Sequence, residues 1–322
     1  MRRGGRVRRS LLAAGILVVA FLTSTPSVYA SPPIYPPKMW LVNADGTGAE
    51  KIAQDLDHGA WRSKWSPDGR FLLYEGVQGI HVLEVETGEK WTSDDWYEWD
   101  PDWSPDGERI VFSRFTGKGT DLFAISPDGS DEERLTWTPR KDERWPIWSP
   151  DGNFIAFVRP GRATAPSFWV VDVRDGSERV LAEKWTSGPS AWSPDGSTLA
   201  FLSQRSDLFT VKIDGTQLRR LARTKFSESG LDWSPDGTQI VVGGGSLRVF
   251  RADGSGIEWT AQEGAEYPQW SPDGETIAYE KRGDVWVIGV NAQGHRNITR
   301  TNKADEDWPS WSPDGSRIAY MK

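Results

Sequence analysis

Aromatic and acidic residues recur just before seven copies of one pentapeptide, Trp-Ser-Pro-Asp-Gly, and together they have the chemistry of a binding surface. An aromatic ring offers a flat apolar plate that also attracts cations, and a carboxylate accepts hydrogen bonds. Such a set suits a sugar and, equally, a basic or aromatic-rich peptide. The predicted ligand-binding residues are Trp61, Trp96, Trp99, Asp100, Glu143, Trp145, Glu266, Tyr267, Asp307 and Trp308.

Two other interpretations of these residues are open. An aromatic residue lies three or four positions before the pentapeptide in five of its copies, and a residue that recurs with a repeat often packs between repeats. The carboxylates are, in turn, candidates for glycoside chemistry, which requires two of them about 5–10 Å apart. The carboxylates concerned are Glu98, Asp100, Glu143, Glu266 and Asp307.

No metal or cofactor site is predicted. The chain has no cysteine and only three histidines, His58, His81 and His295. His81 falls within a predicted strand and His295 in a predicted outer turn, so the histidines are not expected to converge. The acidic segments also lack the Asp-x-Asp-x-Asp-Gly spacing of a calcium loop.

The pentapeptide itself predicts the fold that positions these residues. Neighbouring copies begin 37 to 45 residues apart, and repeats of about 40–45 residues with several strands each are typical of β-propeller blades. Pro presets the φ angle of a type I turn, and Gly accepts the left-handed conformation that closes a hairpin. The Trp residues of the motif, which we expect to pack between blades, are Trp65, Trp103, Trp148, Trp192, Trp233, Trp270 and Trp311.

Each repeat supplies four short strands, which we name A to D in chain order from the motif Trp. After the seventh copy only a B strand fits before Lys322, whereas segments 39–42 and 51–53 supply C and D strands without A or B. Joining the two ends completes one blade and removes its free edges. The sequence therefore predicts an all-β, seven-bladed β-propeller of four-stranded antiparallel blades. Its ring closes by pairing the N-terminal C–D strands with the C-terminal A–B strands.

The first 30 residues have the pattern of a secretory signal peptide. Five arginines precede an apolar run of 12 residues, 11–22, whereas a membrane-spanning helix needs about 20. We therefore expect cleavage after Ala30, a short linker at 31–37, the propeller at 38–322 and no stable membrane span. The protein is expected to be exported to the periplasm or outside the cell by the Sec route, or by the twin-arginine route that Arg8 and Arg9 fit.

The charge balance disfavours some classes of partner. Beyond residue 30 the chain has 33 basic and 46 acidic residues, a net charge of −13. An acidic surface argues against nucleic acid and anionic membranes as partners. The 292 residues beyond Ala30 are enough to bury a core without disulfides.

The seven pentapeptides and the strands after them resemble the TolB-type propeller repeat, also called the WD40-like PD40 repeat, over nearly all of residues 38–322. TolB itself adds an α/β domain and has six blades. Here only 31–37 precede the first predicted strand, so the resemblance does not imply a role in the Tol envelope complex. The repeat is also similar to the propeller of prolyl oligopeptidase relatives, but the sequence has no Gly-x-Ser-x-Gly nucleophile elbow. Seven-bladed oligogalacturonate lyases have a similar architecture and use a histidine-rich metal site.

The sequence favours a non-enzymatic binding or scaffold module over an enzyme. In a propeller the D–A connections and the B–C hairpins share one face, and loops on a rigid scaffold often carry function. We expect a protein or a cell-surface glycan to bind there. The alternative is a carbohydrate-active lyase or glycosidase that uses the acidic residues at the channel mouth.

Overall fold

The computed structural model describes residues 38–52, 60–76, 79–93, 97–161, 166–183, 186–203, 205–223, 229–301 and 305–322. The predicted signal peptide (1–30) and linker (31–37), as well as His58, Trp96, Trp185 and the side chain of Trp61, lie outside the described residues. The compact unit is 35–322, and its described part contains strands and no helix. In the described part, no helix is therefore long and apolar enough to span a bilayer.

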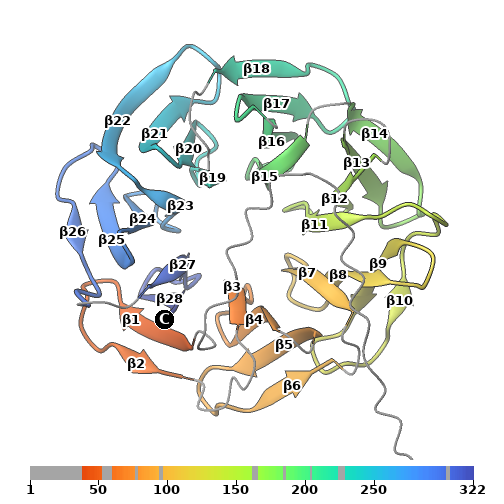
Figure 1. The fold of residues 1–322 in the computed structure, drawn as a ribbon, viewed down its shortest axis with the longest axis horizontal. Helices are drawn as coiled ribbons and strands as arrows, with labels where there is room; N and C mark the ends of the chain where they lie inside the picture. Colours follow the sequence, from red (N-terminus) through yellow and green to blue (C-terminus); the bar gives the residue numbers. More distant parts are fainter. Residues whose placement is uncertain are drawn as a thin grey trace, which may run out of the picture. The chain divides into compact units, whose positions relative to one another are not determined.

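Seven four-stranded antiparallel sheets form the blades of a ring, as the sequence predicts (Figure 1). Within each blade the strands run from A, nearest the centre, to D at the rim. Blade 1 contains β3 (Ala60–Trp65), β4 (Phe71–Gly76), β5 (Gly79–Glu84) and β6 (Lys90–Thr92); blade 2 contains β7 (Glu98–Trp103), β8 (Ile110–Phe115), β9 (Thr120–Ile125) and β10 (Glu133–Arg134); blade 3 contains β11 (Arg144–Trp148), β12 (Phe154–Arg159), β13 (Ser167–Asp172) and β14 (Glu178–Ala182).

The remaining four blades repeat this plan. Blade 4 contains β15 (Thr186–Trp192), β16 (Thr198–Ser203), β17 (Leu208–Lys212) and β18 (Arg219–Ala222); blade 5 contains β19 (Gly230–Trp233), β20 (Gln239–Gly243), β21 (Ser246–Arg251) and β22 (Ile257–Glu263); blade 6 contains β23 (Glu266–Trp270), β24 (Thr276–Lys281), β25 (Asp284–Gly289) and β26 (Arg296–Asn297); blade 7 contains β27 (Asp307–Trp311), β28 (Arg317–Met321), β1 (Met39–Asn43) and β2 (Glu50–Lys51).

Blade 7 closes the ring with strands from both ends of the propeller. Strand β1 pairs antiparallel with β28, with Met39 opposite Met321 and Asn43 opposite Arg317. Lys38 and Lys322 extend this ladder by exchanging two backbone hydrogen bonds of 2.7 and 2.8 Å. The predicted closure is therefore confirmed.

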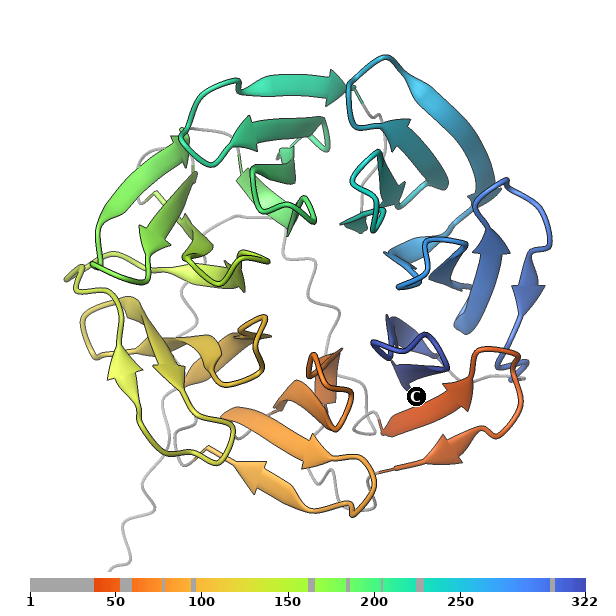
Figure 2. The same cartoon turned by 180° about the vertical axis from the view of Figure 1, so that it is seen from behind.

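Each pentapeptide forms the hairpin between strands A and B, and Figure 2 shows these hairpins gathered around the centre of the ring. In blade 1 the Ser66 hydroxyl donates to the Asp68 carboxylate over 2.5 Å and accepts the amide N–H of Phe71 over 2.9 Å. Gly69 has a φ of 73° and faces Pro313 of the preceding blade. Ser, Asp and Gly are thus needed for the turn itself. We call this side, with the A–B hairpins and C–D turns, the A–B face, and the opposite side the D–A face.

The motif Trp side chains join neighbouring blades. The indole N–H of Trp65 donates to the backbone carbonyl of Ser310 in the preceding blade over 3.0 Å, and that of Trp103 donates to Lys64 over 3.2 Å. Trp192, Trp233 and Trp311 make the equivalent bond. All seven motif Trp residues are buried, so the predicted packing role is confirmed.

Three side chains on the innermost strands accept a second contact between blades. The residue before the motif Trp accepts the backbone N–H of the next blade's Trp: Asp102 from Trp148 over 2.8 Å, Asp232 from Trp270 over 2.9 Å, and Gln269 from Trp311 over 2.7 Å. Burial raises the pKa of Asp232 to about 7 from 3.8, against the effect of these N–H bonds. Gln269, the neutral residue at the equivalent position of the next blade, avoids the cost of burying a carboxylate.

Replacing Asp232 with asparagine should therefore flatten the pH dependence of stability. The unfolded chain ionises Asp232 near pH 4 and the native chain only near pH 7, so the wild type loses stability as the pH rises between these values. At pH 8 the variant should be more stable by roughly 1–3 kcal/mol, and near pH 4 the two proteins should be equal. Urea unfolding at pH 4, 6 and 8 measures this. Asp236→Asn is a control for which the opposite change is expected. Hydrogen bonds lower the pKa of Asp236, so removal of this carboxylate should destabilise the protein at pH 8.

Candidate functional site

Most of the predicted site residues lie within the innermost strands and not in the loops before them; Glu143 precedes β11, and Trp96 lies outside the described residues. Strands β7, β11, β23 and β27 begin four or five residues before the motif Trp. Each contains an irregular register with one residue in the left-handed region, such as Trp145 with φ 53° and Trp308 with φ 52°. These bulges let the strand continue past a Pro, so the Pro and Gly residues that indicated a loop belong to a bent strand.

The bulges place one aromatic and one charged residue side by side in five blades. The pairs occupy the fourth and third positions before the motif Trp and occur in both orders: Trp61–Arg62, Trp99–Asp100, Arg144–Trp145, Glu266–Tyr267 and Asp307–Trp308. Blades 4 and 5 have 188–189 (Gly-Pro) and 229–230 (Ser-Gly) instead. The D–A face therefore has an aromatic and charged side and a side with small residues.

The described aromatic residues of these pairs are half-buried. Trp145 packs against the apolar cluster between blades 3 and 4, and Trp308 against the cluster between blades 7 and 1. Tyr267 and Trp308 contact each other with ring centroids 5.6 Å apart. The guanidinium carbon of Arg144 lies 4.5 Å from the ring centroid of Trp99, and the exposed ring of Tyr97 contacts Trp99 as well. The rings thus pack between blades and still keep part of their surface exposed.

Glu143, which the sequence analysis includes among the ligand-binding residues, has an enclosed side chain. Its carboxylate is fully buried, is paired with Arg159, and accepts hydrogen bonds from the hydroxyls of Thr136 and Thr138. Glu98 pairs with Arg114 in the same way in blade 2, and Glu306 pairs with Lys322 over 3.1 Å in blade 7. A carboxylate enclosed in this way does not face a ligand, so Glu143 and Glu98 hold the end of strand A against strand B.

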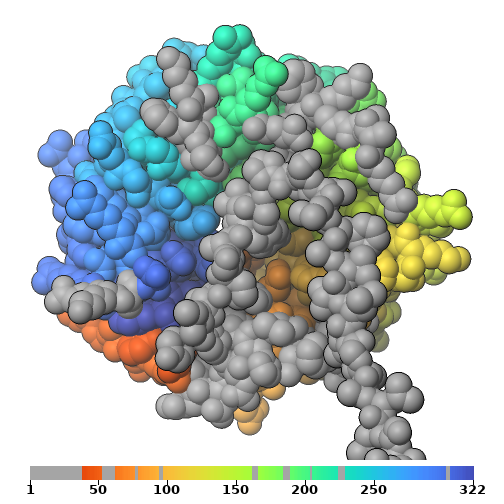
Figure 3. Space-filling model, viewed as in Figure 1, coloured from red at the N-terminus to blue at the C-terminus, as the bar shows by residue number. Residues whose placement is uncertain are grey.

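Three carboxylates that form no salt bridge with a described residue act on one another electrostatically on blades 6 and 7. The D–A side of these blades is shown in blue in Figure 3. Glu266 lies opposite Glu280 in the β23–β24 ladder, and Asp307 begins β27. Among the described residues none of the three has an ion pair. Burial raises the pKa of Glu280 to about 7, and the charges of Glu266 and Asp307 contribute to this rise. Burial also raises the pKa of Asp307 to about 6. We call Glu266, Glu280 and Asp307 the acidic sector.

A second carboxylate pair lies on blades 1 and 2. The Glu75 carboxylate accepts the backbone N–H of Asp100 over 3.1 Å, and the Asp100 carboxylate accepts that of Trp145 over 3.3 Å. Burial and the neighbouring Asp100 charge raise the pKa of Glu75 to about 7, whereas Arg62 and Arg144 oppose the rise. This pair is therefore partly compensated by two arginines, unlike the acidic sector.

Glu75 and Glu280 were not identified from the sequence, although a signal exists. Both lie ten residues after the motif Trp, and both follow a buried tyrosine in strand B. The equivalent positions in the other blades are Ser113, Val158, Leu202, Gly243 and Met321, all of which are uncharged. A charged residue at a position that is otherwise apolar or small marks these two blades.

The described residues do not form a metal site. No group of three or more His, Cys, Asp or Glu side chains in the described ranges has the arrangement needed to hold a metal ion. His81 stacks on Tyr74 inside blade 1 at 4.8 Å, and His295 stacks on Trp286 in blade 6 at 5.7 Å. The two described histidines thus lie in different blades, as the sequence predicts.

The fold and the motif together define a seven-bladed β-propeller built from Trp-Ser-Pro-Asp-Gly repeats. The family model of the TolB β-propeller domain (PD40) matches residues 145–322, so the chain belongs to this family.

Relatives of this chain carry different names. An uncharacterised protein of Agrobacterium fabrum is 25% identical over 67% of this chain and 82% of its own length. The Tol-Pal system protein TolB of Anaeromyxobacter dehalogenans is 28% identical over 71% of this chain and 54% of its own length. An uncharacterised peptidase of Bacillus subtilis is 28% identical over 46% of this chain but only 23% of its own length. The chain thus spans about half or less of these last two relatives.

Solved structures confirm the fold alone. A TolB-like protein from Agrobacterium tumefaciens superposes with a TM-score of 0.59 at 19% identity, covering 89% of this chain and 98% of that one. An oligogalacturonate lyase in complex with manganese superposes with a TM-score of 0.68 at 15% identity, covering 89% of this chain and 96% of that one. Since a TolB-like protein and a lyase share the architecture, the fold does not decide the function.

Proposed function

We propose that this protein is an exported, non-enzymatic binding module that recognises a protein or a glycan on its D–A face. The observation that carries the proposal is the acidic sector beside the contacting rings of Tyr267 and Trp308. Glu266, Glu280 and Asp307 are half-buried or buried, repel one another and have no cationic partner among the described residues. A cation from a partner relieves that repulsion and gains contact with the aromatic rings.

The membership of the TolB propeller family supports a binding role, and the relatives' names include a Tol-Pal system protein. Export rests on the pattern of the first 30 residues. Since the sector is acidic and aromatic, the partner group that fits it best is a lysine or arginine side chain of a protein. A glycan would use the aromatic rings together with the carboxylates as hydrogen-bond acceptors.

A carbohydrate-active enzyme is the second candidate. The observation in its favour is that burial raises the pKa of Glu75 and of Glu280 to about 7, which suits a carboxyl group that donates a proton near neutral pH. The structural similarity to an oligogalacturonate lyase points to the same class. In this candidate function Glu75–Asp100 or Glu280–Asp307 would act as the acid–base pair.

The double variant Glu266→Gln/Asp307→Asn should lose the binding of basic peptides by about tenfold or more, because charge-assisted hydrogen bonds to the cation are lost. An array of synthetic peptides and glycans identifies a ligand of the purified protein, and titration calorimetry measures its affinity. Affinity for a basic peptide should also fall as the pH is lowered from 8 to 5, since Glu280 and Asp307 gain protons over that range.

Glu86→Gln is the matched control, because Glu86 is exposed in a turn on the opposite face. Equal binding by the control and the double variant would contradict the assignment of the face. Release of products from polysaccharides, abolished by Glu75→Gln or Glu280→Gln, would instead establish the enzyme.

A further inference from the structure

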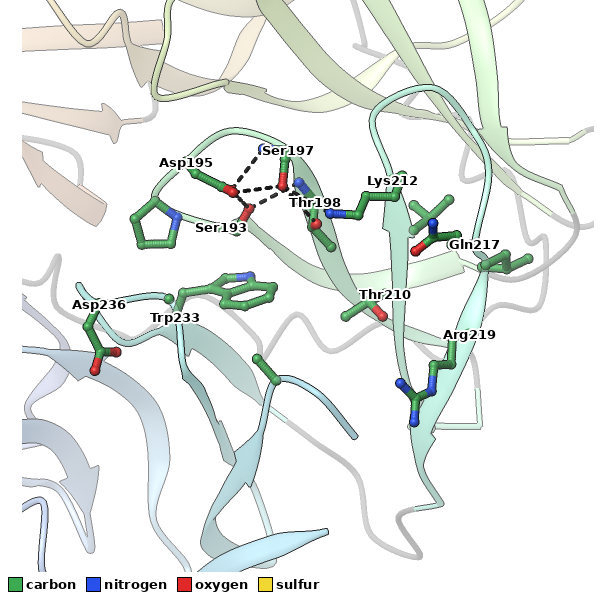
Figure 4. Close-up of a pocket in the computed structure, with 15 residues that line it drawn as sticks. Ser193, Asp195, Ser197, Thr198, Thr210, Lys212, Gln217, Arg219, Trp233 and Asp236 are labelled. Atoms are coloured by element: carbon green, nitrogen blue, oxygen red, sulfur yellow. Dashed lines mark hydrogen bonds between the residues drawn. The ribbon is translucent and has the colours of Figure 1, made fainter. Parts of the chain in front are cut away.

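A groove between blades 4 and 5 opens on the A–B face, away from the acidic sector. Its volume is about 600 Å³, and it lies beside the Ser193–Thr198 hairpin (Figure 4). Trp233 and Thr198 line one part of it, and Lys212 and Arg219, from β17 and β18, line another. A volume of this size holds a small molecule of one or two sugar rings.

At two positions that line the groove, the side chain differs from most of its equivalents in other blades. The residue six positions after the motif Trp lies against the motif Trp of the next blade. Phe71 contacts Trp103 with ring centroids 6.5 Å apart, and the Arg317 guanidinium lies 5.4 Å from the Trp65 ring centroid. In blade 4 this position is Thr198, a small residue like Thr276 of blade 6, and Trp233 borders an open groove beside it.

Thr210 is the second of these residues, and it differs from its equivalents in polarity and not in size. The equivalent residues of strand C in the other blades are apolar: Val82, Ala124, Val170, Val249, Val287 and Leu41. Thr210 is only 8% exposed, and the structure gives its side chain no hydrogen bond to any described residue. Thr210 lines the groove (Figure 4), where its hydroxyl is a polar group at a position that is otherwise apolar. It is therefore available to a ligand in the groove.

Two cations, Lys212 and Arg219, line the groove together with two carboxylates, Asp195 and Asp236, which accept hydrogen bonds from the serine hydroxyls of their own hairpins. Lys212 Nζ donates to the Ser197 hydroxyl over 3.2 Å, and Arg219 Nη1 donates to the Asp253 carbonyl over 2.7 Å. Within the described ranges neither side chain forms a salt bridge. The nearby Asp195 carboxylate is occupied by its own hairpin, where it accepts from the Ser193 hydroxyl over 2.5 Å and the Ser197 amide over 3.0 Å.

From these features we infer that the groove binds an anionic sugar, one that carries a carboxylate or a phosphate. Lys212 and Arg219 hold the anionic group, as ammonium and guanidinium groups do in charge-assisted hydrogen bonds. The hydroxyls of Thr198 and Thr210 and the amide of Gln217 bond to the sugar hydroxyls, and Trp233 supplies an apolar surface for the sugar C–H groups. This site is independent of the one on the D–A face.

Calorimetric titration of the purified protein with D-glucuronate, glucose 6-phosphate and glucose tests the inference. At least one of the two anions should bind, with glucose at least about tenfold weaker because it lacks the charge. Binding of glucuronate alone would identify a carboxylate site, and binding of glucose 6-phosphate alone a phosphate site. Failure of both anions to bind, or equal binding of glucose, would overturn the proposal.

Three variants locate the binding. Thr198→Phe should fill the groove as Phe71 and Phe154 do in their blades, and should abolish binding while the protein stays folded. Lys212→Met/Arg219→Met should weaken it by about tenfold or more. Arg179→Met is the matched control, because Arg179 makes the same kind of bond in blade 3, to the carbonyl of Ile213 over 3.1 Å. A folded Thr198→Phe protein that binds the anion unchanged would place the site elsewhere.

Discussion

Replacing Trp65 with alanine should lower the free energy of unfolding by about 3–5 kcal/mol, the usual cost of truncating a buried tryptophan. Trp65 is 8% exposed and packs in the cluster that joins blade 1 to blade 7, where the two ends of the propeller meet. The substitution also removes the hydrogen bond from the indole N–H to the Ser310 carbonyl. The loss therefore combines a cavity with a lost hydrogen bond between blades at the point of ring closure.

Urea unfolding of the purified protein, followed by circular dichroism, measures the change. Trp65→Phe should cost less than the alanine variant, because it keeps most of the apolar contact and loses the hydrogen bond. Trp137→Ala is the surface control: Trp137 is 69% exposed and should change the stability by less than about 1 kcal/mol. An alanine variant at position 65 as stable as the Trp137 variant would show that the interface between blades 7 and 1 contributes little.

The sequence determined the scaffold because its signals are local and repeated. A Ser-Pro-Asp-Gly turn specifies its own hairpin through hydrogen bonds within six residues, as Ser66, Asp68 and Phe71 show. Seven copies and the unpaired strands at the two ends then fix the blade count and the closure. The motif Trp is a large apolar ring at the end of a strand, and this was sufficient to predict that it packs between blades.

The site was harder to predict because its geometry depends on contacts between blades. Glu143 and Glu266 both precede a motif Trp and read alike in the sequence. Their environments differ because blade 3 provides Arg159 from strand B, whereas blade 6 provides Glu280 opposite Glu266. The charge that a carboxylate meets is set by a residue some 15 positions away on the neighbouring strand, which only the register reveals.

The groove between blades 4 and 5 shows the same dependence. Thr198 and Thr210 are ordinary strand residues in the sequence, and each becomes notable only when the blades are aligned. Comparison with Phe71 and Phe154 then shows a smaller side chain at Thr198, and comparison with Val170 shows a polar one at Thr210. In a repeat protein, departures from the repeat are therefore more informative about function than the repeat itself.

Replacing Arg159 with methionine should destabilise the protein by about 3–5 kcal/mol, because it leaves the buried Glu143 carboxylate without its cation. Arg159 also pairs with Glu178 over 2.7 Å and lies over the Trp169 ring at 4.2 Å, so methionine keeps apolar contact but no charge. Burial already raises the pKa of Glu143, and removing Arg159 raises it further. The variant should therefore be closest to the wild type at acidic pH, where Glu143 is protonated, and should lose stability as the pH rises.

Adding Glu143→Gln to the Arg159→Met variant should recover much of the loss, since no buried charge is then left unpaired. Urea unfolding of the two single variants and the double variant at pH 5 and pH 8 gives the coupling between the two positions. The same proteins also decide between the two roles of Glu143. In a scaffold role, Glu143→Gln changes stability and leaves ligand binding on the D–A face intact. Lost binding at unchanged stability would return Glu143 to the ligand-binding set.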